Sequence, residues 1–214
     1  KWRSETKGVH GGTLRSQFDE TSEAIFLNSG FIYSSAEEAE SAFGDEINRY
    51  LYSRFGNPTV SMFEEKLRII EGAESCKATG SGMSAVFAAL ASFLNAGDRL
   101  VAPKALFGSC YIICKEILPK FGIEICFVDG TNLEDWEKAL SKPTKAIFLE
   151  TPSNPSLEII DISKISQLAK VSNAKVFVDN VFSTPILQKP IDLGADVVIY
   201  SATKHIDGQG RCLG

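Results

Sequence analysis

Between residues 99 and 201, short apolar runs alternate with segments patterned like helices. The runs RLVAP (99–103), KAIFLE (145–150) and DVVIYS (196–201) lack the strict polar–apolar alternation of a half-exposed strand. Strands that are buried on both faces, each followed by a helix, pair in parallel through crossover connections. The sequence therefore predicts an α/β fold with a mainly parallel sheet covered by helices on both faces.

The same patterns locate the other expected elements. Further strands are expected at 75–79, 123–128 and 175–179, and helices at 57–70, 81–94, 107–118, 132–140 and 161–171. The first of these helices has Asn57 as its N-cap and Pro58 as its first residue, and it ends near Gly72. Residues 1–50 are polar and weakly periodic, and they are expected to form an extended arm with a short helix at 35–43.

Composition excludes several classes of partner. The 214 residues carry a net charge of -5, with 22 basic side chains scattered among 27 acidic ones, so neither nucleic acid nor an anionic membrane is expected to bind. The longest apolar stretch, 84–94, is too short to span a bilayer, and the start lacks the apolar core of a secretory signal. These features predict a cytoplasmic protein.

The five cysteines are irregularly spaced, as expected of reduced thiols. Cys110 and Cys114 lie one helical turn apart, which is the spacing of half a metal site. The two histidines, His10 and His205, are far away in sequence, so buried thiols that pack like small apolar side chains are the favoured interpretation. No metal is predicted.

Polar residues follow three of the expected strands. Glu150 ends one strand and Asn154 lies shortly after it, Asp179 ends the next, and Lys204 follows the last. Ser201 and Thr203 precede this lysine. Because ligands of parallel α/β sheets bind beyond the carboxyl ends of the strands, these side chains are expected at one site.

The segment GSGMSA (80–85) opens an expected helix and fits the pattern G-x-G-x-x-A. Alone, the pattern is compatible with a dinucleotide site, a simpler phosphate site or a tight turn. A dinucleotide site needs an acidic residue at the end of the next strand, but the next strand ends at Pro103, followed by Lys104. This observation counts against a nicotinamide cofactor and favours a single phosphate.

Lys204, placed beside a buried strand, is expected to be desolvated and to lose its proton easily, which makes its amine a nucleophile for carbonyl groups. A carboxylate such as that of Asp179 can hold a ring nitrogen protonated, and hydroxyls with a helix start can bind a phosphate. These are the requirements of pyridoxal 5'-phosphate (PLP), whose protonated ring withdraws electrons from a substrate carbanion.

Linked motifs along the chain resemble the cysteine/methionine-metabolism family of PLP-dependent enzymes. In chain order they are YSRFGNPT (52–59), GSGMSA (80–85), ETPSNP (150–155), VFVDN (176–180) and YSATKHIDGQGR (200–211). The resemblance covers essentially the whole chain. It implies a fold-type-I PLP-dependent transferase.

The resemblance also implies roles for individual residues. Lys204 would carry the cofactor covalently and move protons between substrate carbons, Asp179 would pair with the ring nitrogen, and Asn154 would bind the ring hydroxyl. The residues implied to bind the phosphate are Ser201, Thr203 and the backbone of Ser81, Gly82 and Met83.

Two further implications concern the neighbouring subunit and the cofactor ring. Tyr52 and Arg54 match family residues that hold the phosphate of the neighbouring subunit, which implies a homodimer or a homotetramer. In this reading, residues 1–50 are an arm that contacts the neighbouring subunit, and residues 51–214 are the PLP-binding domain. Phe107 stands where many members have a tyrosine stacked on the cofactor ring, so it keeps the stacking and lacks the phenol.

Within the family, segments 9–31 and 106–110 look most like members that replace the γ-substituent of an activated homoserine with sulfide. An amino-acid substrate, sulfide and a role in methionine synthesis are therefore expected. Open alternatives are γ-replacement by cysteine, γ-elimination, a nicotinamide-dependent oxidoreductase and a non-catalytic binding fragment. The family continues beyond DGQGR into a smaller C-terminal domain with an arginine for the substrate carboxylate, so the chain is expected to be about half of an enzyme and inactive alone.

Overall fold

The computed structural model of the chain describes residues 2–214. These residues form two compact units, of which the first ends at Ala78 and the second spans Thr79–Gly214. The expected division into 1–50 and 51–214 rests on contacts with a neighbouring subunit, and it stays a prediction.

The first unit contains three helices joined by irregular segments. They are α1 (Ser4–His10), α2 (Ala36–Phe43) and α3 (Pro58–Glu71). The structure confirms the expected helices α2 and α3, including the Asn57 N-cap and a left-handed Gly72 (φ 84°) at the end of α3. Helix α1 was not predicted, because it buries none of its side chains and has no side-chain cap, so no apolar period marks it.

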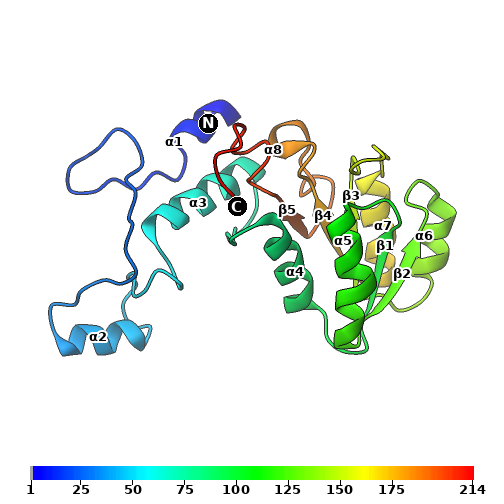
Figure 1. Ribbon diagram of the computed structural model, residues 1–214, viewed down its shortest axis with the longest axis horizontal. Coiled ribbons are helices and arrows are strands. Elements are labelled where there is room, and N and C mark those ends of the chain that lie inside the picture. Colours follow the sequence, from blue (N-terminus) through cyan, green and yellow to red (C-terminus); the bar gives the residue numbers. More distant parts are fainter. Residues whose placement is uncertain (1) are drawn as a thin grey trace. The chain divides into compact units, whose positions relative to one another are not determined.

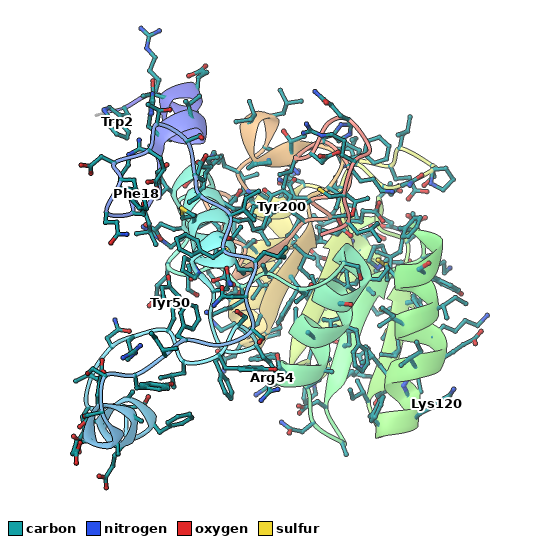
Figure 2. The ribbon with its side chains drawn as sticks, turned by 60° about the vertical axis from the view of Figure 1, so that its left-hand side comes forward. Trp2, Phe18, Tyr50, Arg54, Lys120 and Tyr200 are labelled. Atoms are coloured by element: carbon teal, nitrogen blue, oxygen red, sulfur yellow. The ribbon has the colours of Figure 1, made fainter. Side chains whose placement is uncertain are left out.

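Large side chains on the irregular segments of the first unit differ in their exposure. Phe18 and Tyr50, labelled in Figure 2, are two examples. The Tyr50 ring stacks on Phe31 with 5.6 Å between ring centroids, whereas Phe18 is 80% exposed.

The second unit is built on a five-stranded parallel sheet with the order β2-β1-β3-β4-β5 (Figure 1). The strands are β1 (Arg99–Pro103), β2 (Glu124–Val128), β3 (Ala146–Glu150), β4 (Lys175–Asp179) and β5 (Val197–Ile199). The prediction of a parallel α/β sheet is confirmed. The strand expected at 75–79 is wrong: within residues 2–214 this segment pairs with no strand, and β-structure requires a partner to accept its backbone hydrogen bonds.

The helices of the second unit alternate with its strands. They are α4 (Gly82–Phe93), α5 (Gly108–Ile112), α6 (Leu133–Leu140), α7 (Ile162–Ser172) and α8 (Thr184–Leu187). A π-helical turn, Ile113–Ile117, and a 3-10 turn, Leu118–Phe121, continue α5, so the single helix expected at 107–118 changes its winding halfway.

Two apolar clusters cover the two faces of the sheet. Helices α4 and α5 pack on one face against strand residues such as Leu100 and Phe148. Helices α6 and α7 pack on the other face against residues such as Val101 and Leu149. Neighbouring strand residues thus enter opposite clusters, which explains why β1 and β3 are buried at every position and confirms helices on both faces (Figure 1).

The two cysteines one turn apart belong to the first of these clusters. Cys110 and Cys114 are buried at 1% and 0% exposure, which confirms that they pack as apolar side chains. Among residues 2–214, no helix has both the length and the hydropathy needed to cross a membrane.

Candidate functional site

A cavity of about 630 Å³ lies in the second unit, at the carboxyl edge of the sheet. Its lining contains all the predicted site residues of this unit: Ser81, Gly82, Met83, Phe107, Asn154, Asp179, Ser201, Thr203 and Lys204. They lie at the ends of strands, in the loops that follow strands and at the start of α4, and the parallel sheet brings the strand ends to one edge. Tyr52 and Arg54 belong to the first unit.

The start of α4 offers backbone N–H groups to the cavity. Ser81 is the N-cap, and its hydroxyl accepts from the Ser84 N–H at 3.2 Å. A Cβ atom added to Gly82 would lie 2.6 Å from the Ser201 Cβ, so only glycine allows the helix start to approach Ser201 this closely. Free N–H groups at a helix N-terminus, with a serine hydroxyl beside them, suit a phosphate group.

Two carboxylates lie side by side at the base of the site. Glu150 and Asp179 end the adjacent strands β3 and β4 and are partners in their register. Both are buried, and burial is the main reason that the pKa of Glu150 rises to about 7 and that of Asp179 to about 6. The Asp179 carboxylate also raises the pKa of Glu150 by charge repulsion.

Each carboxylate oxygen of Asp179 has a neighbouring hydrogen-bond donor. Its Oδ1 accepts from the Val181 N–H at 3.1 Å, and the Cys110 thiol lies 3.9 Å from Oδ2. Burial raises the pKa of that thiol far above its ordinary value, so Cys110 remains a neutral donor. A buried carboxylate at the base of a cavity is suited to pair with a cationic ring nitrogen.

Asn180, the next residue, connects the loops that follow three strands. Its amide nitrogen donates to the Tyr200 hydroxyl at 2.8 Å and to the Gln188 carbonyl at 3.1 Å. Gln188 in turn donates to the Thr151 carbonyl at 2.9 Å. This network, near Tyr200 in Figure 2, holds the loops after β3, β4 and β5 in place.

Lys204 differs from the sequence-based expectation in one respect. Its side chain lines the cavity but is exposed, whereas the sequence argument predicted a desolvated lysine. Lys204 lies in the turn that follows β5, a strand of three residues, and no part of the sheet covers this turn within residues 2–214. Thr203, its neighbour, binds the backbone of Gly214 through its hydroxyl, at 3.2 Å to the carbonyl oxygen.

In the first unit, Tyr52 and Arg54 lie close together before α3. The Arg54 guanidinium lies 5.0 Å from the ring centroids of both Tyr52 and Phe55 (Arg54 is labelled in Figure 2). Arg54 and Tyr52 are exposed, so both are available to a ligand or a second chain.

Glu150 and several other residues that line the cavity were not predicted to have a role. These include Ser109, Val181, Phe182, Tyr200 and His205. Glu150 was visible as an acidic strand end, but its hydrogen-bond partners are distant in sequence or are backbone atoms. Tyr200 directly precedes Ser201, and Val181 and Phe182 lie within three residues of Asp179, and that proximity was the available signal.

The donor set fits PLP. Helix-start N–H groups and hydroxyls suit its phosphate, a buried carboxylate suits its ring nitrogen, a phenyl ring suits its ring face, and an exposed lysine amine suits its aldehyde. All of these groups line one cavity.

The sequence is similar to known PLP-dependent enzymes. A sequence model described as "Cys/Met metabolism PLP-dependent enzyme" matches residues 5–214. The chain is 59% identical over 209 residues to the O-succinylhomoserine sulfhydrylase of Mycobacterium tuberculosis, covering 98% of the chain and 52% of the relative. It is 42% identical over 206 residues to an L-methionine gamma-lyase of Fusobacterium nucleatum, covering 96% of the chain and 52% of that protein. The chain spans about half the length of the curated relatives it matches.

Solved structures show the same similarity in three dimensions. A Campylobacter jejuni structure that contains N'-pyridoxyl-lysine-5'-monophosphate matches with a TM-score of 0.93 and 32% identity, over 100% of this chain and 53% of that one. A cystathionine gamma synthase from Xanthomonas oryzae, in complex with aminoacrylate and cysteine, matches with a TM-score of 0.92 and 32% identity, with the same coverage.

Proposed function

Because the chain belongs to the Cys/Met metabolism family of PLP-dependent enzymes, we propose that the protein containing it is an O-succinylhomoserine sulfhydrylase. This enzyme would replace the succinyl group of O-succinylhomoserine with sulfide and release homocysteine and succinate, as a step of methionine synthesis. The 59% identity to proteins of that name supports the choice of reaction. The observation that carries the proposal is that Lys204, Asp179 and the start of α4 line the same cavity.

The residues that would hold PLP follow from the chemistry of the cavity. Lys204 Nζ would bind its aldehyde carbon, Asp179 its ring nitrogen, and Asn154 its ring hydroxyl, with the Phe107 ring stacked on the ring face. The phosphate would bind the start of α4 together with Ser201 and Thr203. A cationic ring nitrogen beside Asp179 would favour the ionised carboxylate and so lower the pKa that burial raises.

Bound PLP supplies an electron sink that stabilises negative charge on the substrate α-carbon. Lys204 would act as the base, taking the α-proton on Nζ and moving protons at the β-carbon before succinate leaves the γ-carbon. The exposed position of its amine at the cavity wall leaves it free to approach a substrate. Phe107 offers an apolar surface and no proton, so proton transfer would depend on Lys204.

The proposal includes a second subunit. Tyr52 and Arg54 would bind the phosphate in the cavity of a neighbouring copy, which would make a homodimer the smallest complete unit and a pair of dimers the assembly. The exposure of these two side chains supports such a role. A cytoplasmic location would suit this chemistry.

The cofactor is tested by borohydride reduction of the full-length natural gene product after incubation with PLP. We expect a reduced adduct that maps to Lys204 by peptide mass spectrometry, and none in the Lys204→Ala variant. Full activity in that variant would refute the mechanism.

The reaction is tested by product analysis with O-succinylhomoserine. Sulfide should yield homocysteine and succinate. Cystathionine formed preferentially from added cysteine would instead indicate a cystathionine γ-synthase. Release of a 2-oxo acid and ammonia without a nucleophile would indicate a γ-lyase, the reaction named for the Fusobacterium relative.

A further inference from the structure

Glu150 makes two hydrogen bonds that connect separate walls of the cavity. Its Oε2 accepts from the backbone N–H of Phe107 at 2.5 Å, and its Oε1 accepts from the backbone N–H of Asn154 at 2.9 Å. Phe107 follows β1 and Asn154 follows β3, and these strands are neighbours in the sheet. One buried carboxylate thus joins the two loops.

We infer that Glu150 is a positioning residue, which holds Phe107 and Asn154 where they contact the ring of the cofactor. This inference rests on the proposed cofactor site. The side chains of Phe107 and Asn154 line the cavity, while their backbone N–H groups point back to the carboxylate. A displacement of Glu150 would therefore move both ring contacts together.

The bonding pattern supports a positioning role. Each carboxylate oxygen accepts one backbone N–H, from Phe107 and from Asn154, so the carboxylate is fixed between the two loops. The alternative of a simple helix cap accounts only for Phe107, which precedes α5 and has no capping hydrogen bond from its own side chain. It leaves the bond to Asn154 without a role.

The chemistry of the carboxylate cannot be supplied by an amide. Glutamine has one acceptor oxygen, and its NH₂ group would face the second backbone N–H, which would leave a buried donor without an acceptor. Aspartate keeps both acceptors but is one methylene shorter. Glu150→Gln and Glu150→Asp thus perturb the two bonds in different ways.

The experiment measures PLP affinity and the visible absorbance band of bound PLP in the full-length natural gene product. Glu150→Gln should weaken PLP binding about tenfold, the result of one unpaired buried donor. It should also shift the pH midpoint of the band, because Asn154 no longer holds the ring hydroxyl. Glu158→Gln is the matched control: Glu158 lies on the same loop, where its backbone exchanges hydrogen bonds with Ser153, and both quantities should stay unchanged.

The outcomes separate this inference from the proposed function. A folded Glu150→Gln protein with unchanged PLP affinity and an unchanged band would overturn the inference alone. If Glu150→Gln does not fold, the PLP affinity of Glu150→Asp is measured instead, and an intermediate affinity is expected. If neither variant folds, Glu150 is required for folding, and the inference is overturned. A wild-type protein that takes up no PLP would overturn the proposed function and this inference with it.

Discussion

Gly82 is a residue of the candidate site at which the structure leaves no room for a side chain. An alanine Cβ there would lie 2.6 Å from the Ser201 Cβ and 3.0 Å from its Cα, and the backbone contact cannot be relieved by a rotamer change. Gly82→Ala should therefore push the start of α4 away from Ser201, destabilise the protein by about 1–3 kcal/mol, and weaken PLP binding. Thermal unfolding and PLP titration measure the two effects.

Gly80 provides the control for this substitution. It lies two residues earlier, and an added Cβ would meet nothing within 4 Å. Gly80→Ala should keep near wild-type stability and PLP affinity. Equal behaviour of the two variants would contradict the close approach that the structure shows at Gly82.

The two buried carboxylates predict a pH dependence of stability in the cofactor-free protein. The folded-state pKa of Asp179, about 6, and that of Glu150, about 7, both lie above the ordinary values of 3.8 and 4.5. The folded state therefore binds more protons, so the stabilisation is complete below about pH 4 and is lost as the pH rises through 6 and 7. At about 1.4 kcal/mol for each pKa unit, the Asp179 contribution is about 3 kcal/mol at most.

Urea unfolding of the cofactor-free, full-length gene product at pH 5 and pH 8 tests this dependence. Asp179→Asn cannot titrate, so the loss of stability between these pH values should be smaller in the variant than in the wild type. Asp161→Asn, which replaces one exposed N-cap of α7 by another capping residue, should leave the difference unchanged. An undiminished difference in Asp179→Asn would show that other groups cause it.

At the scale of elements, α3 depends on an unusual cap. The Asn57 Oδ1 accepts from the Thr59 N–H at 2.9 Å, while its Nδ2 donates to the Phe26 carbonyl and the Ser53 hydroxyl, both at 3.0 Å. Asn57 is buried, so Asn57→Ala removes the cap and leaves the Phe26 carbonyl without this donor. The free energy of opening of α3 should fall by about 1–3 kcal/mol.

Amide hydrogen exchange of peptides from α3 measures this change, because exchange reports local opening. Asn132 caps α6 in the same way, with its Oδ1 accepting from the Glu134 N–H at 3.0 Å, but it is exposed. Asn132→Ala should cost α6 only the cap itself, about 1 kcal/mol. A smaller effect at Asn57 than at Asn132 would contradict the double role of Asn57.

The helices and strands that were predicted correctly are recognisable from their own short stretch of sequence. Strand β3 and helix α3 are marked by an apolar run and by a cap followed by a helical period, and both formed where expected. The strand expected at 75–79 did not form because no strand pairs with this segment within residues 2–214, and α1 was missed because it buries nothing. Local patterns thus predict the helices and strands that bury their own apolar side chains.

The candidate site shows the same limit. Residues at strand ends could be predicted, because a parallel sheet sends every carboxyl end to one edge. The bond between Glu150 and Phe107 joins residues 43 positions apart, and the exposure of Lys204 depends on the path of the turn after β5. Neither property is encoded in the neighbouring sequence, so both required the structure.

At the scale of the whole molecule, the first unit exposes three large apolar side chains that lie close together in sequence. Ile25, Leu27 and Ile32 lie within eight residues and are 80%, 96% and 93% exposed. Contiguous exposed apolar side chains mark interaction surfaces, and the proposed function requires a second copy beside the segment that carries Tyr52 and Arg54. We expect residues 25–32 to be covered by that second copy.

The double variant Leu27→Glu/Ile32→Glu tests this expectation in the full-length gene product. Two buried charges at the interface should lower the molar mass measured by analytical ultracentrifugation and should weaken PLP binding, because Arg54 would no longer reach the neighbouring phosphate. Val171→Glu is the control, since Val171 is 89% exposed at the end of α7 in the second unit and should tolerate the charge. A double variant with the wild-type mass would exclude residues 25–32 from the interface, whereas a lower mass with unchanged PLP affinity would remove Tyr52 and Arg54 from the phosphate site.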